Sequence, residues 1–435
     1  MPDRGALSER AVVRRLHDRL GLGATRQDLE QSILEGPDVT LTKLLTIDEP
    51  APTNVPDPPQ IRDLPADDPA RKAQDQQRSD QERQAILWWL DRMATVKAPR
   101  AEKLTWFWHG HFATSNEKVR DVGLMLTQNQ TFRAQGQDSV AKLAQAMVVD
   151  PALNIWLDNH TNRKFAPNEN LGRELMELFT LGVGEYSESD VRQAARALTG
   201  WSYKDRALTF KKANFDDGPK TVLGSIAGLD SDSLVDLLTA RPDSARFIAT
   251  RLWNRLVSSD SPSEAELEQL TDAYGPGTSV RGLLRALATS AAFRDPTKTL
   301  VKQPVEWAVG LARAVGRPVG TLDDKDRATA LNQLKALGQT PFRPPNVGGW
   351  PAGAPYITPT ATVARVRFAA VLLTGGTLGS VDDPPSGTNA RAEWARATLG
   401  VDAWSARTRA ALSQVADPRQ LLIVAAVSPE YVVSG

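Results

Sequence analysis

The sequence predicts a mainly α-helical protein. Apolar residues recur with the 3.6-residue period of a helix along most of the chain, whereas the strict alternation of a strand is nearly absent. Hydrophobic residues make up 41% of the 435 residues, which is enough for a sizeable core. Two stretches, Ala207–Lys212 and Lys220–Leu223, favour at most one short β-hairpin near 207–223.

Apolar spacing and end signals place the helices in order along the chain. They are expected at Leu7–Leu20, Arg26–Leu34, Asp80–Ala94, Asp138–Val149, Glu188–Thr199, Asp243–Val257, Ser263–Tyr274, Val280–Ala288, Pro304–Val315, Asp324–Leu337 and Ala390–Leu399. A further helix follows Pro167 and Asn168, which are typical of a helix start, and it ends before Gly182 and Gly184.

Irregular segments divide the chain into three parts. Residues 1–47 are expected to form N-terminal helices that pack on the main body, because they are too few to bury a core alone. Residues 48–79 begin with a proline- and acid-rich stretch, which favours an extended connection over the surface. Residues 80–435 form the main helical domain.

The composition excludes several kinds of site. There are no cysteines, so disulfides, thiolate metal sites and a cysteine nucleophile are excluded. Lysine plus arginine and aspartate plus glutamate number 52 each, so no net charge draws the protein to nucleic acid. Neither a Gly-x-Ser-x-Gly elbow nor an HExxH motif occurs.

The first residues predict a basic amphipathic helix rather than an export signal. On this helix His17 follows Arg14 and Arg15 and is expected to be exposed. No stretch approaches the roughly 20 apolar residues needed to span a bilayer. We therefore expect no membrane insertion and a cytoplasmic location.

The helix after Pro167 has a concentrated polar face. Its apolar side carries Leu171, Leu175, Leu178 and Phe179, and its opposite side carries Asn170, Arg173, Glu174 and Glu177. Such a face can bind a ligand, or it can be a solvated face in which arginine neutralises the carboxylates. The spacing alone favours the solvated face.

A His-x-His pair lies in the stretch TWFWHGHFATSNEK. In a regular helix the rings of His109 and His111 would diverge by about 200°, but a break at Gly110 would let both reach one metal ion. Glu174 and Glu177, at positions i and i+3, can also share an ion. The alternative is the end of a core helix, with one histidine bound to backbone carbonyls and the other exposed.

These groups suggest a metal-dependent hydrolase acting on an anionic or carbohydrate substrate. His109, His111 and Glu174 would hold a divalent metal, and Glu177 would be a further ligand or the general base, so Glu174 and Glu177 are the catalytic candidates. The residues expected to bind the substrate are Asn168, Asn170, Arg173, Trp201 and Trp350. The alternative is a non-catalytic helical protein whose polar helix is an internal network.

Several blocks of the sequence occur together, in this order, in one bacterial family. The blocks are FWHGHFATS, LDNHTNRKFAPNENLGRELMELFTLGVGEY, DVRQAARALTGW, VKQPVEWAVGLARAVG, PPNVGGWPAG and the terminal SPEY. Through them the chain resembles the domain of unknown function 1800 family over nearly its whole length. The resemblance implies a single large helical unit whose motif positions here are His109, His111, Asn168, Asn170, Arg173, Glu174 and Glu177, with Trp201 and the NVGGW turn behind them.

The resemblance also implies a partner. Family members are often encoded beside proteins that resemble alkaline phosphatases and sulfatases, so this chain would escort or bind such a protein and be exported with it. One departure concerns Asp216 and Asp217, where the family tends to have His-Asp. A histidine that would complete a metal site is therefore missing.

Overall fold

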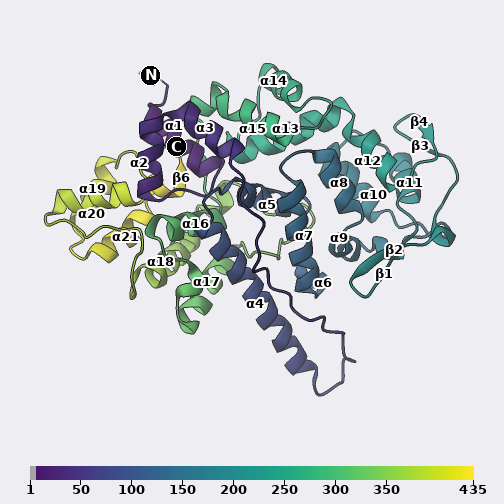
Figure 1. Cartoon of the computed structure of the whole chain (residues 1–435), viewed down its shortest axis with the longest axis horizontal. Helices are drawn as coiled ribbons and strands as arrows, with labels where there is room; N and C mark the ends of the chain where they lie inside the picture. Colours follow the sequence, from purple (N-terminus) through teal and green to yellow (C-terminus); the bar gives the residue numbers. More distant parts are fainter. Residues whose placement is uncertain (1–5) are drawn as a thin grey trace.

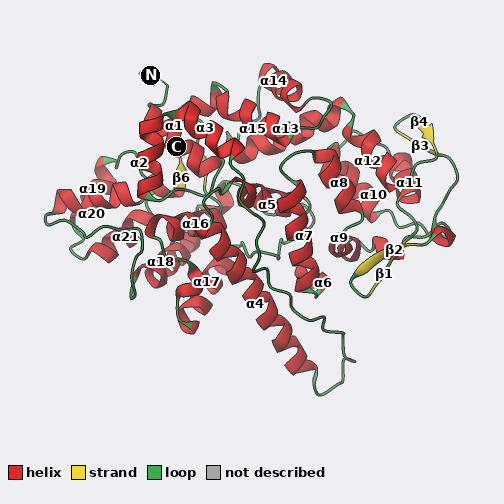
Figure 2. Ribbon diagram, viewed as in Figure 1, coloured by secondary structure: helices red, strands yellow, loops and turns green. Residues whose placement is uncertain are grey.

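The computed structural model describes residues 6–435 and confirms the mainly α-helical prediction. Helices fill the molecule, and strands occur in the described part only as three two-stranded antiparallel sheets (Figures 1 and 2). Residues 1–5 of the predicted N-terminal segment lie outside the description. No helix within residues 6–435 combines the length and the apolar character needed to cross a bilayer.

The N-terminal part contains four helices. They are α1 (Glu9–Arg19), α2 (Arg26–Glu35), α3 (Pro37–Thr46) and α4 (Arg71–Thr95). Residues 47–70 are extended and run beside α4, where Gln74 donates to the carbonyl of Arg62 and Gln81 to that of Pro59. The long helix α4 begins at Arg71 rather than Asp80, so the predicted connection includes its first turns.

The middle of the chain contains the predicted site residues. Its elements are α5 (Arg100–His111), α6 (Asn116–Val119), α7 (Val122–Gln135), α8 (Val140–Val148), α9 (Pro151–Trp156), η1 (Asn159–Thr161), α10 (Asn170–Glu174), the π-helix η2 (Leu175–Thr180) and α11 (Glu188–Ala197). The predicted helix after Pro167 is therefore α10 followed by a π-helical segment.

The strand prediction is right in place and wrong in pairing. Strand β2 (Ala207–Phe210) pairs with β1 (Trp201–Lys204), and β3 (Lys220–Val222) pairs with β4 (Ser225–Ala227). Each strand turns back on its nearest neighbour because turns with positive φ, at Asp205 and Arg206 and at Leu223, close two tight hairpins. A third sheet joins β5 (Leu300–Val301) to β6 (Val433–Ser434).

The C-terminal half consists of helices and short turns. The helices are α12 (Ser231–Thr239), α13 (Pro242–Leu256), α14 (Glu264–Tyr274), α15 (Val280–Thr289), α16 (Pro304–Val315), α17 (Asp324–Ala336), α18 (Pro359–Leu373), α19 (Thr388–Thr398), α20 (Ala406–Ser413), α21 (Pro418–Ala426) and α22 (Pro429–Val432). The 3₁₀ turns are η3 (Lys212–Asn214), η4 (Ala292–Arg294), η5 (Val319–Thr321) and η6 (Ala354–Tyr356).

Helix α5 lies between two hydrophobic cores. Phe107 and Trp108 belong to the core formed with α7, α8 and α10–α15, whereas Trp106 belongs to the core formed with α4 and α16–α22. Nearly every residue of α5 is buried, so it has no polar face and no amphipathic period. For this reason the apolar periodicity of the sequence does not reveal α5.

The basic face of α1 is buried rather than exposed. Arg15 and Arg19 donate to backbone carbonyls, among them those of Phe293 and Val257. His17 is also not exposed as expected, because it packs against α2 with its Nε2 atom 2.8 Å from the hydroxyl oxygen of Ser32. Burial lowers the pKa of His17 to about 4. Segments distant in sequence cover this face, which composition does not reveal.

Candidate functional site

His109 is a buried acceptor of a backbone hydrogen bond. Its Nε2 atom accepts from the N–H of Phe342 at 3.0 Å, so that nitrogen carries no proton and the ring is neutral. Burial lowers the pKa of His109 to about 3. The surrounding rings are those of Trp89, Trp106, Phe132, Phe342 and Trp350.

His111 points to a different part of the fold. Its Nε2 atom lies 3.0 Å from the carbonyl oxygen of Phe179, at the end of the π-helix, and donates to it. Its buried Nδ1 atom has no hydrogen-bond partner in the described structure. Burial, and then the charge of Arg251, lower the pKa of His111 to about 3. α5 is regular through Gly110, so the two rings have separate partners, and neither is exposed.

Gly110 and Gly349 connect two of the sequence blocks. Gly349 has a positive φ of 82°, and a Cβ atom there would lie 2.2 Å from the carbonyl oxygen of Gly110. The NVGGW turn can therefore approach α5 only without side chains at this point. Trp350, the next residue, stacks on Trp106 with ring centroids 4.9 Å apart.

The acidic face of α10 and η2 is half-buried. Tyr186 donates a hydrogen bond to Glu177, and burial together with the charge of Glu177 raises the pKa of Glu174. Arg173 donates to Glu188 at 2.7 Å. Among residues 6–435, no group of three or more His, Cys, Asp or Glu side chains is placed to hold a metal ion. The metal centre stays a prediction.

The two asparagines predicted to bind substrate lie at the start of α10. The side-chain oxygen of Asn168 accepts from the N–H of Asn170 at 3.0 Å, and its amide donates to the carbonyl of Asp158. Asn168 thus shapes the turn into the helix, as asparagine commonly does. Asn170 itself is exposed.

Trp201 and the two aspartates lie near the first hairpin. Trp201 is half-buried on β1, with its ring 5.4 Å from that of Phe210. Asp216 holds Arg196 through two hydrogen bonds and accepts from the N–H of Gly218. Asp216 therefore shapes the turn before Gly218.

Trp350, by contrast, lines a cavity between α5 and α13. The cavity has a volume of about 110 Å³ and reaches the surface at the exposed Ala352. Its lining consists of Trp106, Phe107, Gly110, Arg251, Asn254, Arg255, Gln303, Trp350 and Ala352. Part of the lining is aromatic and part is polar and cationic, with no carboxylate among the lining residues.

The polar wall comes from α13. Arg251 is largely buried beside the cavity and forms no hydrogen bond or ion pair with any described residue, while burial and the charge of Arg255 lower its pKa. The buried Oδ1 atom of Asn254 and the buried Nε1 atom of Trp350 also have no partner in the described part of the chain. Such groups are uncommon in a folded protein and call for a ligand or water.

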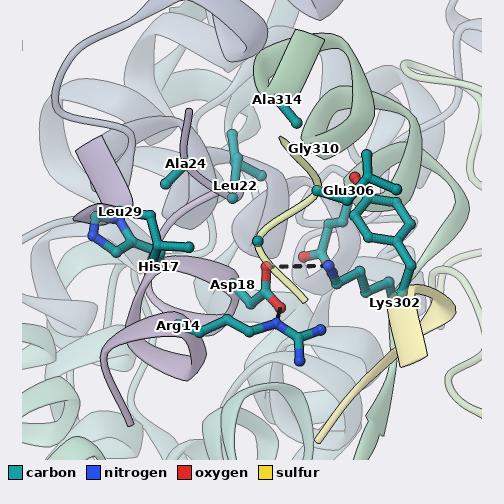
Figure 3. A pocket seen from close by; sticks show the side chains of 14 residues that line it. Arg14, His17, Asp18, Leu22, Ala24, Leu29, Lys302, Glu306, Gly310 and Ala314 are labelled. Carbon is teal, nitrogen blue, oxygen red and sulfur yellow. Dashed lines mark ion pairs between the residues drawn. The ribbon is translucent and has the colours of Figure 1, made fainter. Parts of the chain in front are cut away.

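An ionic network lies behind Arg255. Glu306 accepts from Arg255 at 3.0 Å and from Lys103 at 2.6 Å. On the other side of Lys103, a small pocket of about 30 Å³ contains Asp18, which forms ion pairs with Lys302 at 3.1 Å and with Arg14 at 3.7 Å (Figure 3). The network therefore connects the cavity to α1.

Arg251, Asn254 and Arg255 are not among the residues that the sequence predicted for a site. In the sequence these residues form a simple pattern: two arginines at positions i and i+4, with an asparagine beside the second, on a helix whose other face is apolar. That pattern also describes an ordinary solvated face. Only the packing of α13 against α5 turns it toward an aromatic wall.

Comparison with known proteins identifies a family and no function. No curated protein and no solved structure matches the chain. The family described as protein of unknown function (DUF1800) matches residues 15–433. This match covers nearly the whole chain, as the sequence blocks predicted. The chain therefore belongs to the DUF1800 family.

Proposed function

We propose that the protein binds an anionic small molecule in the cavity between α5 and α13. The observation that carries this proposal is Arg251, a cation at the cavity wall without a counter-charge among the described residues. A charge that loses its hydration without gaining a partner costs several kcal/mol. An anion in the cavity would remove that cost.

The lining offers several donors to such a ligand. Arg251 forms no hydrogen bond with any described residue, and the buried indole N–H of Trp350 has no partner in the described structure. Hydrogen bonds from arginine to an anion are charge-assisted and about twice as strong as neutral ones. These donors support binding of a phosphate, sulfate or carboxylate group.

The aromatic wall supports recognition of an apolar or ring-shaped part of the ligand. Trp106 is held in place by Gln303, which accepts from its indole N–H at 3.3 Å, and Trp350 is stacked on Trp106. A rigid aromatic surface contributes contact area with little loss of side-chain entropy. The organic part of an anionic ligand would lie against this wall.

Anion titrations of the purified protein test the proposal. Trp350 should report binding through tryptophan fluorescence, and calorimetry should give one site per chain for at least one of phosphate, sulfate, acetate or benzoate. We expect Arg251→Gln to weaken binding at least about tenfold, a loss of about 1.4 kcal/mol. Arg246→Gln is the matched control, because Arg246 lies on the same helix but pairs with Glu264 at 2.6 Å on the surface.

Two results would overturn the proposal. One is the absence of binding by every anion tested at millimolar concentration. The other is equal binding by the wild type and by Arg251→Gln, because the affinity would then come from elsewhere.

The two functions predicted from the sequence stay predictions. The metal-dependent hydrolase is supported by the adjacent carboxylates of Glu174 and Glu177 on one helix face. Elemental analysis of the purified protein beside a His109→Ala/His111→Ala variant would test it, and one metal per chain in the wild type alone is the expected result. The escort of a phosphatase- or sulfatase-like protein is tested by co-purification of the two chains.

A further inference from the structure

We infer that the anionic group bound in this cavity is a compact tetrahedral dianion, a phosphate or sulfate group. The inference rests on the proposed function and goes beyond it in charge, size and shape. It is carried by the charge balance of the ionic network, the volume of the cavity and the kind of atoms that line it.

The network behind the cavity has more cations than carboxylates. Beside the cavity the cations are Lys103, Arg251 and Arg255, and Glu306 is the one carboxylate that pairs with any of them in the described structure. Three positive charges against one negative charge leave a surplus of two. A desolvated surplus of this size is costly, and a dianion beside Arg251 and Arg255 would balance it.

The position of the surplus points to the cavity rather than to the rest of the network. Asp18 has cations on both sides, and Asp402 accepts from Arg14 at 3.2 Å. Glu306 must serve both Lys103 and Arg255 through one oxygen atom, Oε1. The charge of Arg251 and part of that of Arg255 are thus unbalanced where both line the cavity.

The volume fits a small group. The space of about 110 Å³ admits a phosphate or sulfate group, which has five heavy atoms. An organic part of the ligand would extend past Trp350 toward the surface at Ala352.

The lining atoms also favour an oxyanion with several acceptor oxygens. Arg251 and Arg255 lie one helical turn apart on α13, and both line the cavity. The amide of Asn254 can turn its nitrogen toward the ligand, because its oxygen has no partner in the described structure. Two neighbouring guanidinium groups can donate to several oxygens of a tetrahedral group.

Selectivity between two anions of the same shape tests the inference. Sulfate and perchlorate are both tetrahedral and similar in size, but perchlorate carries one charge. At constant ionic strength we expect sulfate and phosphate to bind at least about tenfold more tightly than perchlorate, nitrate or acetate, a difference of about 1.4 kcal/mol. Titration calorimetry of the full chain measures this ratio directly.

Arg251→Gln makes the test specific to the network. It lowers the surplus from two charges to one, so the ratio of sulfate to perchlorate affinity should fall, whereas Arg246→Gln should leave it unchanged. Because Arg251 has no partner to lose among the described residues, the unliganded Arg251→Gln protein should be at least as stable as the wild type. If Arg251→Gln does not fold, Arg251→Lys takes its place in the test. This variant keeps the charge and should retain the sulfate preference.

The outcomes separate this inference from the proposed function. Equal or tighter binding of the monoanions would overturn the dianion and leave an anion site intact. No binding of any anion would overturn both. A retained sulfate preference in Arg251→Gln would also overturn the inference, because the preference would then not arise from this surplus.

A last pair of ligands distinguishes a free ion from an ester. If phenyl phosphate binds more tightly than inorganic phosphate, the ligand is an organic phosphate whose ring lies against Trp350. Trp350→Leu should then abolish the difference in affinity. Inorganic phosphate bound more tightly identifies the free ion. Both results support a dianion in the cavity.

Discussion

The cavity between α5 and α13 and the acidic face of α10 and η2 balance charge in opposite ways. On the acidic face Glu177 has Tyr186 as a donor, and Arg173 has acidic partners. In the cavity wall Arg251 has no partner among the described residues, and Arg255 shares Glu306 with Lys103. The acidic face has the greater concentration of polar residues, yet its charged groups have more partners than those of the cavity wall.

This difference shows what a concentration of polar residues does and does not indicate. A polar helix face supplies its own partners, because residues three and four positions apart can bond to one another. A cavity wall built from α5, α13 and the NVGGW turn gathers its groups from segments far apart in sequence. The unsatisfied groups there mark a place for a ligand.

The largest expected effect comes from breaking the network behind the cavity. Glu306→Gln leaves the buried amine of Lys103 and the guanidinium of Arg255 without their shared carboxylate. Removing one partner of a buried ion pair costs about 3–5 kcal/mol, which urea unfolding would measure. Sulfate should restore part of this stability, because the surplus charge rises. If Glu306→Gln is as stable as the wild type and sulfate does not stabilise it, the charge balance proposed for the network is wrong.

A somewhat smaller loss is expected at the contact that forms the aromatic wall. Gly349→Ala places a Cβ atom against the carbonyl of Gly110 in a backbone conformation that favours glycine. Strain and overpacking together should cost about 3 kcal/mol. Gly338→Ala is the control, since its φ is also positive but a Cβ atom there meets no neighbour within 4 Å. Equal losses in the two variants would show that the contact with α5 contributes nothing.

The helical class and the positions of most amphipathic helices followed from the sequence, because one-sided burial leaves a period. Helix α5 left no period, since it is buried on every side between two cores. The same reason explains α1, whose arginines suggested a solvated face but bond to carbonyls of β6 and of the chain after α13. Local pattern cannot show what distant segments cover.

Part of the candidate site was also predictable. The sequence identified Trp350 as a candidate for binding the substrate, and Trp350 lines the cavity. It could not identify Arg251, whose importance lies in the absence of a partner. That property depends on which side chains surround it after folding.

His111 on α5 and Glu174 on the acidic face should respond oppositely to acid. The folded protein keeps His111 neutral down to about pH 3, whereas the ordinary pKa is 6.5, so between these values the unfolded chain binds more protons. The free energy of unfolding therefore falls as the pH drops below 6.5. Between about pH 7.5 and pH 5 the fall amounts to about 2 kcal/mol for this ring. Urea unfolding of His111→Gln at both values should show a pH dependence smaller by that amount, and an unchanged dependence would contradict the burial.

Glu174 should give the smallest effect, with the opposite sign. Burial and the charge of Glu177 raise its pKa in the folded protein, so the carboxylate opposes folding above its ordinary pKa of 4.5 and this penalty disappears as the pH falls. Because Glu174 is half exposed, Glu174→Gln should stabilise the protein at neutral pH by less than about 1 kcal/mol, and by nothing near pH 4. Glu185→Gln, on the exposed loop after η2, is the control. A loss of stability in Glu174→Gln at neutral pH would mean that this carboxylate has a favourable partner, and it would contradict the raised pKa of Glu174.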